Sequence, residues 1–182
     1  MARILLTGRP GCGKTTAVRE TVERLGPAIE VAGFYTEELR RAGRRIGFDV
    51  VTVDGRRGPL ARAGAPGPPV GRYGVDLESF DRVGVAELEA GLSAGADLLV
   101  VDEIGKMELL SDRFVSALER LFDPAEDHVV LGTILRGRHP KADWLRSQSG
   151  VEIIEVTEAN RDALPRRLAE RIGPATSDAG GS

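Results

Sequence analysis

The 182-residue sequence contains a single cysteine, Cys12. One thiol excludes an internal disulfide framework and a multi-cysteine zinc site. Lysine is almost as scarce, because Lys14, Lys106 and Lys141 are the only lysines among 25 basic residues. An arginine bias of this kind is typical of genome composition or thermostability, so it indicates no function.

Long hydrophobic runs are also missing from the sequence. No apolar stretch approaches the roughly 18 residues of a membrane-spanning helix. The first apolar run begins at Ile4, which leaves no room for a signal peptide. Hydrophobic residues make up 41% and charged residues 29% of the chain, as in ordinary soluble domains. We therefore expect a cytoplasmic protein, a monomer that does not interact with membranes.

The net charge of −3 argues against a dedicated nucleic-acid binder, so no nucleic-acid partner is expected. One segment, Glu37 to Val75, is nevertheless basic. Its eight arginines outnumber its four acids and are Arg40, Arg41, Arg44, Arg45, Arg56, Arg57, Arg62 and Arg72. Three interpretations stay open for this segment: a solvated face, an anion-facing flap over a bound nucleotide, or a surface for an acidic partner.

The most informative stretch reads G-R-P-G-C-G-K-T and directly follows the apolar run Ile4-Leu5-Leu6. Its spacing is that of a phosphate-binding loop (Walker A), in which backbone N–H groups and a helix N-terminus surround phosphate oxygens. The residues predicted to bind nucleotide here are Gly8, Arg9, Pro10, Gly11, Cys12, Gly13, Lys14, Thr15 and Thr16. Lys14 is expected to reach the β- and γ-phosphates and to act in catalysis, and Thr15 to bind Mg²⁺.

A second set of polar residues follows the apolar stretch Asp97–Val101. Asp102 is placed where a Walker B carboxylate holds Mg²⁺ through water, at the carboxyl edge of a parallel sheet. Glu103 is expected to point the other way and to take a proton from the attacking water, against the alternative of a structural role. Thr133 is either a sensor of the γ-phosphate or simply the first residue of a loop.

Apolar strands alternate with helical patterns along the chain, which predicts an α/β fold in one domain over residues 1–173. Strands are expected at 4–7, 31–36, 97–101, 129–133 and 151–156, and a β-rich antiparallel insert at about 37–76. The glutamate that follows the Walker B aspartate resembles the pattern of RecA-like P-loop NTPases. This resemblance implies the order 5-1-4-3-2 for the parallel strands, numbered along the chain without the insert. A helix is predicted over 78–92, Trp144 is expected to be a packing residue, and residues 174–182 are predicted to form a mobile tail.

Several stretches closely resemble the small nucleoside-triphosphatase family that includes the cancer-related nucleoside-triphosphatase. The matching stretches are G-F-Y-T-E-E at 33–38, G-R-R-I-G-F-D at 43–49, R-G-P-L at 57–60, D-E-I-G-K-M-E-L at 102–109, G-T-I at 132–134 and N-R at 160–161. The resemblance implies slow Mg²⁺-dependent hydrolysis of ATP, GTP and other nucleoside triphosphates on a P-loop α/β fold with an inserted β-hairpin. Arg9 and Cys12 depart from the proline and valine expected in this family's loop.

Asn160 and Arg161 follow the last predicted strand, at the same sheet edge as the loop. They are candidates for stacking on, or hydrogen bonding to, the base, and the alternative is a helix cap and a surface arginine. Three functions stay open at this point: a nucleoside-triphosphatase, a small nucleoside or metabolite kinase, and a nucleotide-dependent switch or adaptor. Glu103 favours hydrolysis, because a kinase must keep water from the phosphoryl group.

Overall fold

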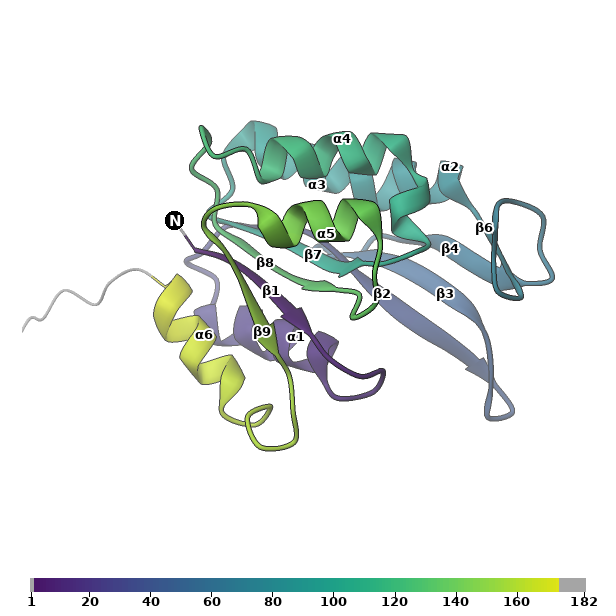
Figure 1. The fold of residues 1–182 in the computed structure, drawn as a ribbon, viewed down its shortest axis with the longest axis horizontal. Helices are drawn as coiled ribbons and strands as arrows, with labels where there is room; N and C mark the ends of the chain where they lie inside the picture. The colour runs from purple at the N-terminus through teal and green to yellow at the C-terminus, as the bar shows by residue number, and fades with distance from the viewer. Residues whose placement is uncertain (1, 174–182) are drawn as a thin grey trace, which may run out of the picture.

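The computed structural model describes residues 2–173, so the tail predicted at 174–182 lies outside the described residues. Helices and strands follow one another along the whole described chain (Figure 1). The strands are β1 (Arg3–Thr7), β2 (Val31–Arg41), β3 (Arg44–Thr52), β4 (Arg57–Ala63), β5 (Pro69–Val70), β6 (Tyr73–Val75), β7 (Leu98–Ile104), β8 (Val130–Ile134) and β9 (Val151–Glu155). The helices are α1 (Lys14–Leu25), α2 (Leu77–Phe80), the π-helical η1 (Asp81–Val85), α3 (Ala86–Ala94), the 3-10 turn η2 (Glu108–Leu110), α4 (Asp112–Leu121), α5 (Pro140–Ser147) and α6 (Leu164–Ile172).

The strands of the described chain form one sheet in the order β5-β6-β4-β3-β2-β7-β8-β1-β9. In this order, neighbouring strands pair in parallel from β2 through β7, β8 and β1 to β9. Strands β3, β4, β6 and β5 continue the same sheet with antiparallel pairing. The carboxyl ends of the parallel strands therefore meet at one edge, where α/β proteins bind their ligands.

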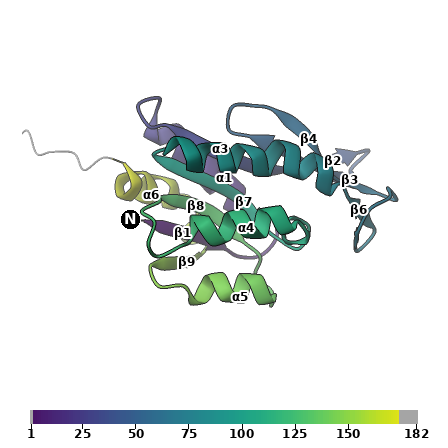
Figure 2. The same cartoon turned by 90° about the horizontal axis from the view of Figure 1, so that it is seen from above.

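Helices cover both faces of this sheet. Helices α3, α4 and α5 lie on one face, and α1 and α6 lie together on the other (Figures 1 and 2). Each face buries its own apolar cluster, because successive side chains of a strand point to opposite faces. The buried runs of β1, β7 and β8 supply both clusters, as expected for strands covered on two sides.

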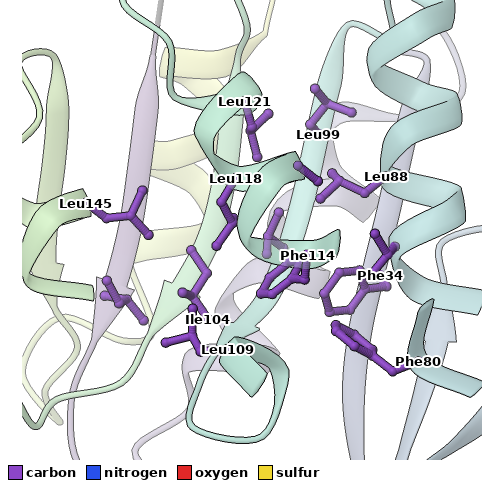
Figure 3. Close-up of a cluster of buried hydrophobic side chains, with 14 of the residues drawn as sticks. Phe34, Phe80, Leu88, Leu99, Ile104, Leu109, Phe114, Leu118, Leu121 and Leu145 are labelled. Carbon is purple, nitrogen blue, oxygen red and sulfur yellow. The ribbon is translucent and has the colours of Figure 1, made fainter. Parts of the chain in front are cut away.

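Three phenylalanines form the centre of the larger cluster (Figure 3). Phe34 of β2, Phe80 of α2 and Phe114 of α4 contact one another edge to face, with ring centroids 5.3 to 5.8 Å apart. All three side chains are fully buried. Edge-to-face pairs add about 0.5–1.5 kcal/mol each beyond area burial, so this trio joins three distant segments of the chain.

Strand β2 is longer than the sequence pattern indicates. The prediction ended the strand at Thr36, but β2 continues to Arg41 and pairs with β3 as far as Arg44. The turn between them places Ala42 at φ 48° and Gly43 at φ 75°, the left-handed conformations of a tight hairpin turn. The sequence E-E-L-R-R at 37–41 has no apolar run and is partly exposed, so its pattern did not indicate a strand, whereas backbone pairing with β3 makes it one.

The helix expected over 78–92 is present as a helical segment from Leu77 to Ala94, which contains the π-turn η1. In η1, a side-chain Cβ on Gly84 would lie 2.8 Å from Val50 Cγ2, so glycine is needed for close packing on the sheet. Trp144, expected as a packing residue, is 37% exposed, since Ala142 and Leu145 are the buried residues of α5.

Candidate functional site

The predicted phosphate-binding loop connects the end of β1 with the start of α1 at Lys14. Gly13 precedes the helix in the left-handed region with φ 103°, and Gly8 has φ 151°. A Cβ on Gly8 would lie 2.9 Å from the Val156 carbonyl oxygen, so only glycine fits there. The loop therefore has the backbone freedom that an anion cradle at a helix N-terminus requires.

Lys14 extends its side chain back over this loop. Its Nζ donates hydrogen bonds to the carbonyl oxygens of Gly8 and Arg9, at 3.3 and 3.4 Å. The ammonium group therefore lies beside the loop, where the sequence analysis placed the cation for the outer phosphates. Cys12 differs from the other loop residues: a Cβ on Gly8 would meet its Sγ at 2.8 Å, which shows that the thiol packs against the loop backbone.

A cavity of about 700 Å³ opens at the carboxyl edge of the parallel strands. Its walls are the loop and first turn of α1, the segment from the end of β7 to η2, the loop after β8, and the insert. The predicted loop residues that line it are Gly8, Pro10, Gly11, Gly13, Lys14, Thr15 and Thr16. Arg9 and Cys12 contribute no wall to this cavity in the described structure.

Asp102 lies at the bottom of the cavity and is 2% exposed. Thr133, in β8, donates a hydrogen bond from its hydroxyl to Asp102 Oδ1 at 2.5 Å. Thr133 is therefore a strand residue and not the first residue of a loop. Burial raises the pKa of Asp102, while the Thr133 and Thr15 hydroxyls and the Lys14 charge oppose that rise. The buried Oδ2 has no hydrogen-bond partner among residues 2–173.

Glu103 lines the same cavity as Asp102, although alternation along a strand predicted opposite directions. The pairing of β7 with β8 shifts register between Val101 and Ile104, and such an irregularity breaks the alternation of side chains. Burial raises the pKa of Glu103; the Lys14 charge lowers it and the Asp102 charge raises it. The two carboxyl groups and the ammonium group thus act on one another within one site.

The side chains of Asn160 and Arg161 have different surroundings in the structure. The Asn160 amide is used in a turn, because its Oδ1 accepts from Thr157 N and its Nδ2 donates to the Glu155 carbonyl, both at 2.8 Å. It neither caps α6 nor lines the cavity. Arg161 lies next to the phosphate-binding loop, with its Cδ 3.8 Å from the position of a Cβ on Gly13. Together with Glu20 of α1 it lines a second hollow beside the loop.

The basic segment is largely neutralised by its own neighbours. Arg57 pairs with Glu37 at 2.5 Å and with Asp49 at 3.0 Å, and Arg62 pairs with Asp49 at 2.5 Å. Arg19 of α1 joins this network through Glu37 at 2.7 Å. Of the segment's arginines, Arg45 lines the cavity, where it pairs with Glu38 at 2.6 Å. These pairs therefore join β4 to β3 and β2, and β2 to α1.

Sequence reasoning assigned no role to two residues at the cavity, Thr36 and Glu108. Thr36 Oγ1 donates to the Asp102 carbonyl oxygen at 2.9 Å and lies 3.3 Å from Glu108 Oε1. Glu108 is 4% exposed, which is unusual for an acid without a cationic partner. Both residues occur in the stretches G-F-Y-T-E-E and D-E-I-G-K-M-E-L, but only the fold brings these stretches together.

The sequence profile of the NTPase family matches residues 3–169. The chain belongs to this NTPase family. It is 45% identical over 167 residues to the nucleoside-triphosphatase THEP1 of Thermotoga petrophila, covering 91% of this chain and 90% of that protein. It is 43% identical over 179 aligned residues to the human cancer-related nucleoside-triphosphatase, covering 90% and 93% of the two chains.

Solved structures of this family have the same fold. The crystal structure of THEP1 from Aquifex aeolicus matches with a TM-score of 0.84 at 34% identity, covering 96% of this chain and 100% of that one. The solution structure of the human cancer-related nucleoside triphosphatase matches with a TM-score of 0.76 at 40% identity, covering 94% and 97%. The α/β fold expected from the sequence is therefore confirmed, as is the expected family.

Proposed function

We propose that this chain is a Mg²⁺-dependent nucleoside-triphosphatase of the P-loop class that hydrolyses ATP, GTP and other nucleoside triphosphates to the diphosphate and phosphate. The observation that carries the proposal is the meeting of the glycine-rich loop, Lys14, Asp102 and Glu103 in one cavity. Family relatives named nucleoside-triphosphatases support it further. No helix within residues 2–173 is long and apolar enough to span a membrane.

In this proposal the loop and Lys14 bind the triphosphate. Backbone N–H groups and the N-terminus of α1 face the phosphate oxygens, and the Lys14 ammonium adds a full positive charge. On phosphate binding, Lys14 exchanges its contacts with the Gly8 and Arg9 carbonyls for phosphate oxygens, which are stronger acceptors. These contacts involve no base atom, so they are the same for every nucleoside triphosphate.

Asp102 and Thr15 fit a Mg²⁺ site. Asp102 presents a buried oxygen, Oδ2, without a hydrogen-bond partner among the described residues, and the Thr15 hydroxyl lies near the same carboxyl group, whose pKa it lowers. Mg²⁺ prefers oxygen ligands and is commonly held by one or two protein groups together with water and substrate phosphates. When bound, the ion would neutralise charge that develops on the β- and γ-phosphates. Thr133 orients Asp102 through its hydrogen bond to Oδ1.

Glu103 is the base of the proposed reaction. The water oxygen forms a bond to the γ-phosphorus, its proton passes to a Glu103 carboxylate oxygen, and the bond to the bridging oxygen breaks so that the diphosphate leaves. Burial raises the pKa of Glu103, which favours uptake of a proton, and the Lys14 charge opposes that rise. The proton acceptor is therefore present next to the phosphate-binding loop.

A direct assay tests this function against the kinase and switch alternatives. Phosphate release is measured from Mg²⁺ complexes of ATP, GTP, CTP and UTP with no acceptor added. We expect release from all four, because phosphate contacts are common to them, and loss of release when EDTA removes Mg²⁺. Formation of the nucleoside diphosphate only when a hydroxyl compound is added, with no free phosphate, would indicate a kinase instead. Binding without turnover would indicate a switch.

Arg161 provides a separate prediction about the nucleoside. If the nucleoside occupies the second hollow beside the loop, Arg161→Ala removes a cation that can stack on any base, and KM rises several-fold for all four nucleotides with kcat little changed. Arg166→Ala is the matched control, because Arg166 is exposed on α6 and pairs with Glu170. Unchanged KM values across the panel would exclude Arg161 from nucleoside binding.

A further inference from the structure

Glu108 is a buried carboxyl group that the proposed hydrolysis does not use. It lies at the start of η2, is 4% exposed, and lines the cavity next to Glu103. Gly105 separates the two carboxyl groups: a Cβ there would lie 2.7 Å from Glu108 Oε2 and 3.2 Å from Glu103 Oε1. Any side chain at Gly105 would displace one of them, so glycine permits this close arrangement.

Hydrogen-bond accounting shows which form of Glu108 fits its surroundings. The Thr36 hydroxyl carries one proton and has two oxygen neighbours, the Asp102 carbonyl at 2.9 Å and Glu108 Oε1 at 3.3 Å. A backbone carbonyl can only accept, so Thr36 donates its proton to Asp102 at the shorter distance. The contact with Glu108 is then a hydrogen bond only if Glu108 is protonated and donates to Thr36.

The charges around Glu108 favour the same neutral form. Burial, followed by the negative charge of Glu103, raises the pKa of Glu108 to about 8, and Asp102 acts in the same direction. The other charged groups lining the cavity are Lys14, Glu38, Arg45, Lys106 and Arg136. Arg45 is paired with Glu38, and none of these cations contacts the Glu108 carboxyl group.

We propose, on the basis of the proposed hydrolysis, that Glu108 is a positioning residue: as a neutral acid it holds the Thr36 hydroxyl on the Asp102 carbonyl and thereby fixes the backbone that carries Asp102 and Glu103. Ionised Glu108 would be an acceptor only and would compete for the single Thr36 proton. It would also add a third negative charge beside the triphosphate. Loss of the Glu108 proton therefore releases the Asp102 carbonyl and lowers kcat.

Two substitutions at position 108 separate a neutral hydrogen-bond donor from an ionisable group. Glu108→Gln keeps a donor to Thr36 at every pH, whereas Glu108→Leu keeps a similar volume and removes the hydrogen bond. We expect Glu108→Leu to lower kcat about tenfold with KM unchanged, the size typical of residues that orient a catalytic group. We expect Glu108→Gln to retain kcat at pH 7. In the parent enzyme kcat/KM, which reports groups of the free enzyme, falls as pH rises through about 8, and this fall is absent in Glu108→Gln.

Thr36→Val tests the path to Asp102. It is expected to lower kcat as much as Glu108→Leu, and the double variant no further, because both changes break one chain of hydrogen bonds. Thr21→Val is the matched control: Thr21 is fully buried and donates to the Ala17 carbonyl at 2.6 Å, away from the cavity. Its kcat should equal that of the parent.

Four outcomes overturn the inference: a loss in Glu108→Gln as large as in Glu108→Leu, an alkaline fall that persists in Glu108→Gln, a parental kcat in Glu108→Leu, or additive losses in the double variant. Circular dichroism and thermal unfolding establish that each variant is folded, and Glu108→Gln with Thr36→Val still decides the matter if Glu108→Leu does not fold. A parent that releases no phosphate would instead contradict the proposed function itself, so the two failures are distinct.

Discussion

Lys14→Ala abolishes tight binding of Mg²⁺-nucleoside triphosphate and leaves the fold intact. The substitution removes the side-chain cation that lies over the loop, where its Nζ is 3.3 Å from the Gly8 carbonyl oxygen. Phosphate oxygens then keep only the backbone N–H groups as partners. Hydrogen bonds to charged groups contribute about 1.5–3 kcal/mol each, so two lost contacts weaken binding by about 10²-fold or more.

Isothermal titration calorimetry with a non-hydrolysable triphosphate measures this loss. The matched control is Lys141→Ala, because Lys141 is exposed on α5 and pairs with Glu119 at 3.5 Å. The control should bind as the parent does. Parental affinity in Lys14→Ala would show that the phosphates do not occupy the glycine-rich loop, and the proposed site would be wrong.

Glu103→Gln has the opposite signature, since it should bind nucleotide and fail to turn it over. Glutamine matches glutamate in shape but cannot accept the proton of the attacking water. We expect kcat to fall by about 10²-fold or more with Kd little changed, as for the loss of a positioned base. The amide also removes a negative charge beside the phosphates, so any change in Kd should be toward tighter binding.

Single-turnover phosphate release and calorimetry on the same sample separate these two effects. Glu119→Gln serves as the control for the substitution, because Glu119 is an exposed glutamate outside the cavity. If Glu103→Gln turned over as fast as the parent, another group would be the base. If it lost binding as well, Glu103 would contribute to the nucleotide site and not to the chemical step.

The sequence was sufficient for the α/β fold because its strongest patterns are buried on two sides. The apolar run 97–101 predicts a strand, and the structure has β7 at Leu98–Ile104. Phe114, Leu118 and Leu121 recur at helical spacing in the sequence and are buried in α4, and Ser111 is its N-cap, whose side chain accepts from Phe114 N. These features depend on local periodicity and on a capping side chain.

Features set by pairing between strands could not be predicted in the same way. The extension of β2 depends on its backbone pairing with β3, and the end of β7 near Glu103 depends on an irregular pairing with β8. Neither strand pairing can be predicted from a single sequence. Local rules nevertheless placed Asp102 and Glu103 at the carboxyl edge of the sheet, where both line the cavity.

Contacts between segments that are distant in the chain could not be predicted from the sequence either. Asn160 was a candidate base contact, but its amide closes a turn. Thr36 and Glu108 are 72 residues apart, and their proximity arises only because β2 lies beside β7. The roles assigned to Lys14, Thr15, Asp102, Glu103 and Thr133 stay predictions, for which the structure provides positions and the experiments above provide tests.

The continuity of β2 has a consequence for how the molecule opens. One uninterrupted strand pairs with β7 in its first half and with β3 in its second, and Thr36 lies where the two halves meet. The insert is therefore connected through β2 to β7, the strand that carries Asp102. Its amides in β3 and in the second half of β2 should exchange with deuterium in the same cooperative unit as those of β7, and not as an independently opening flap.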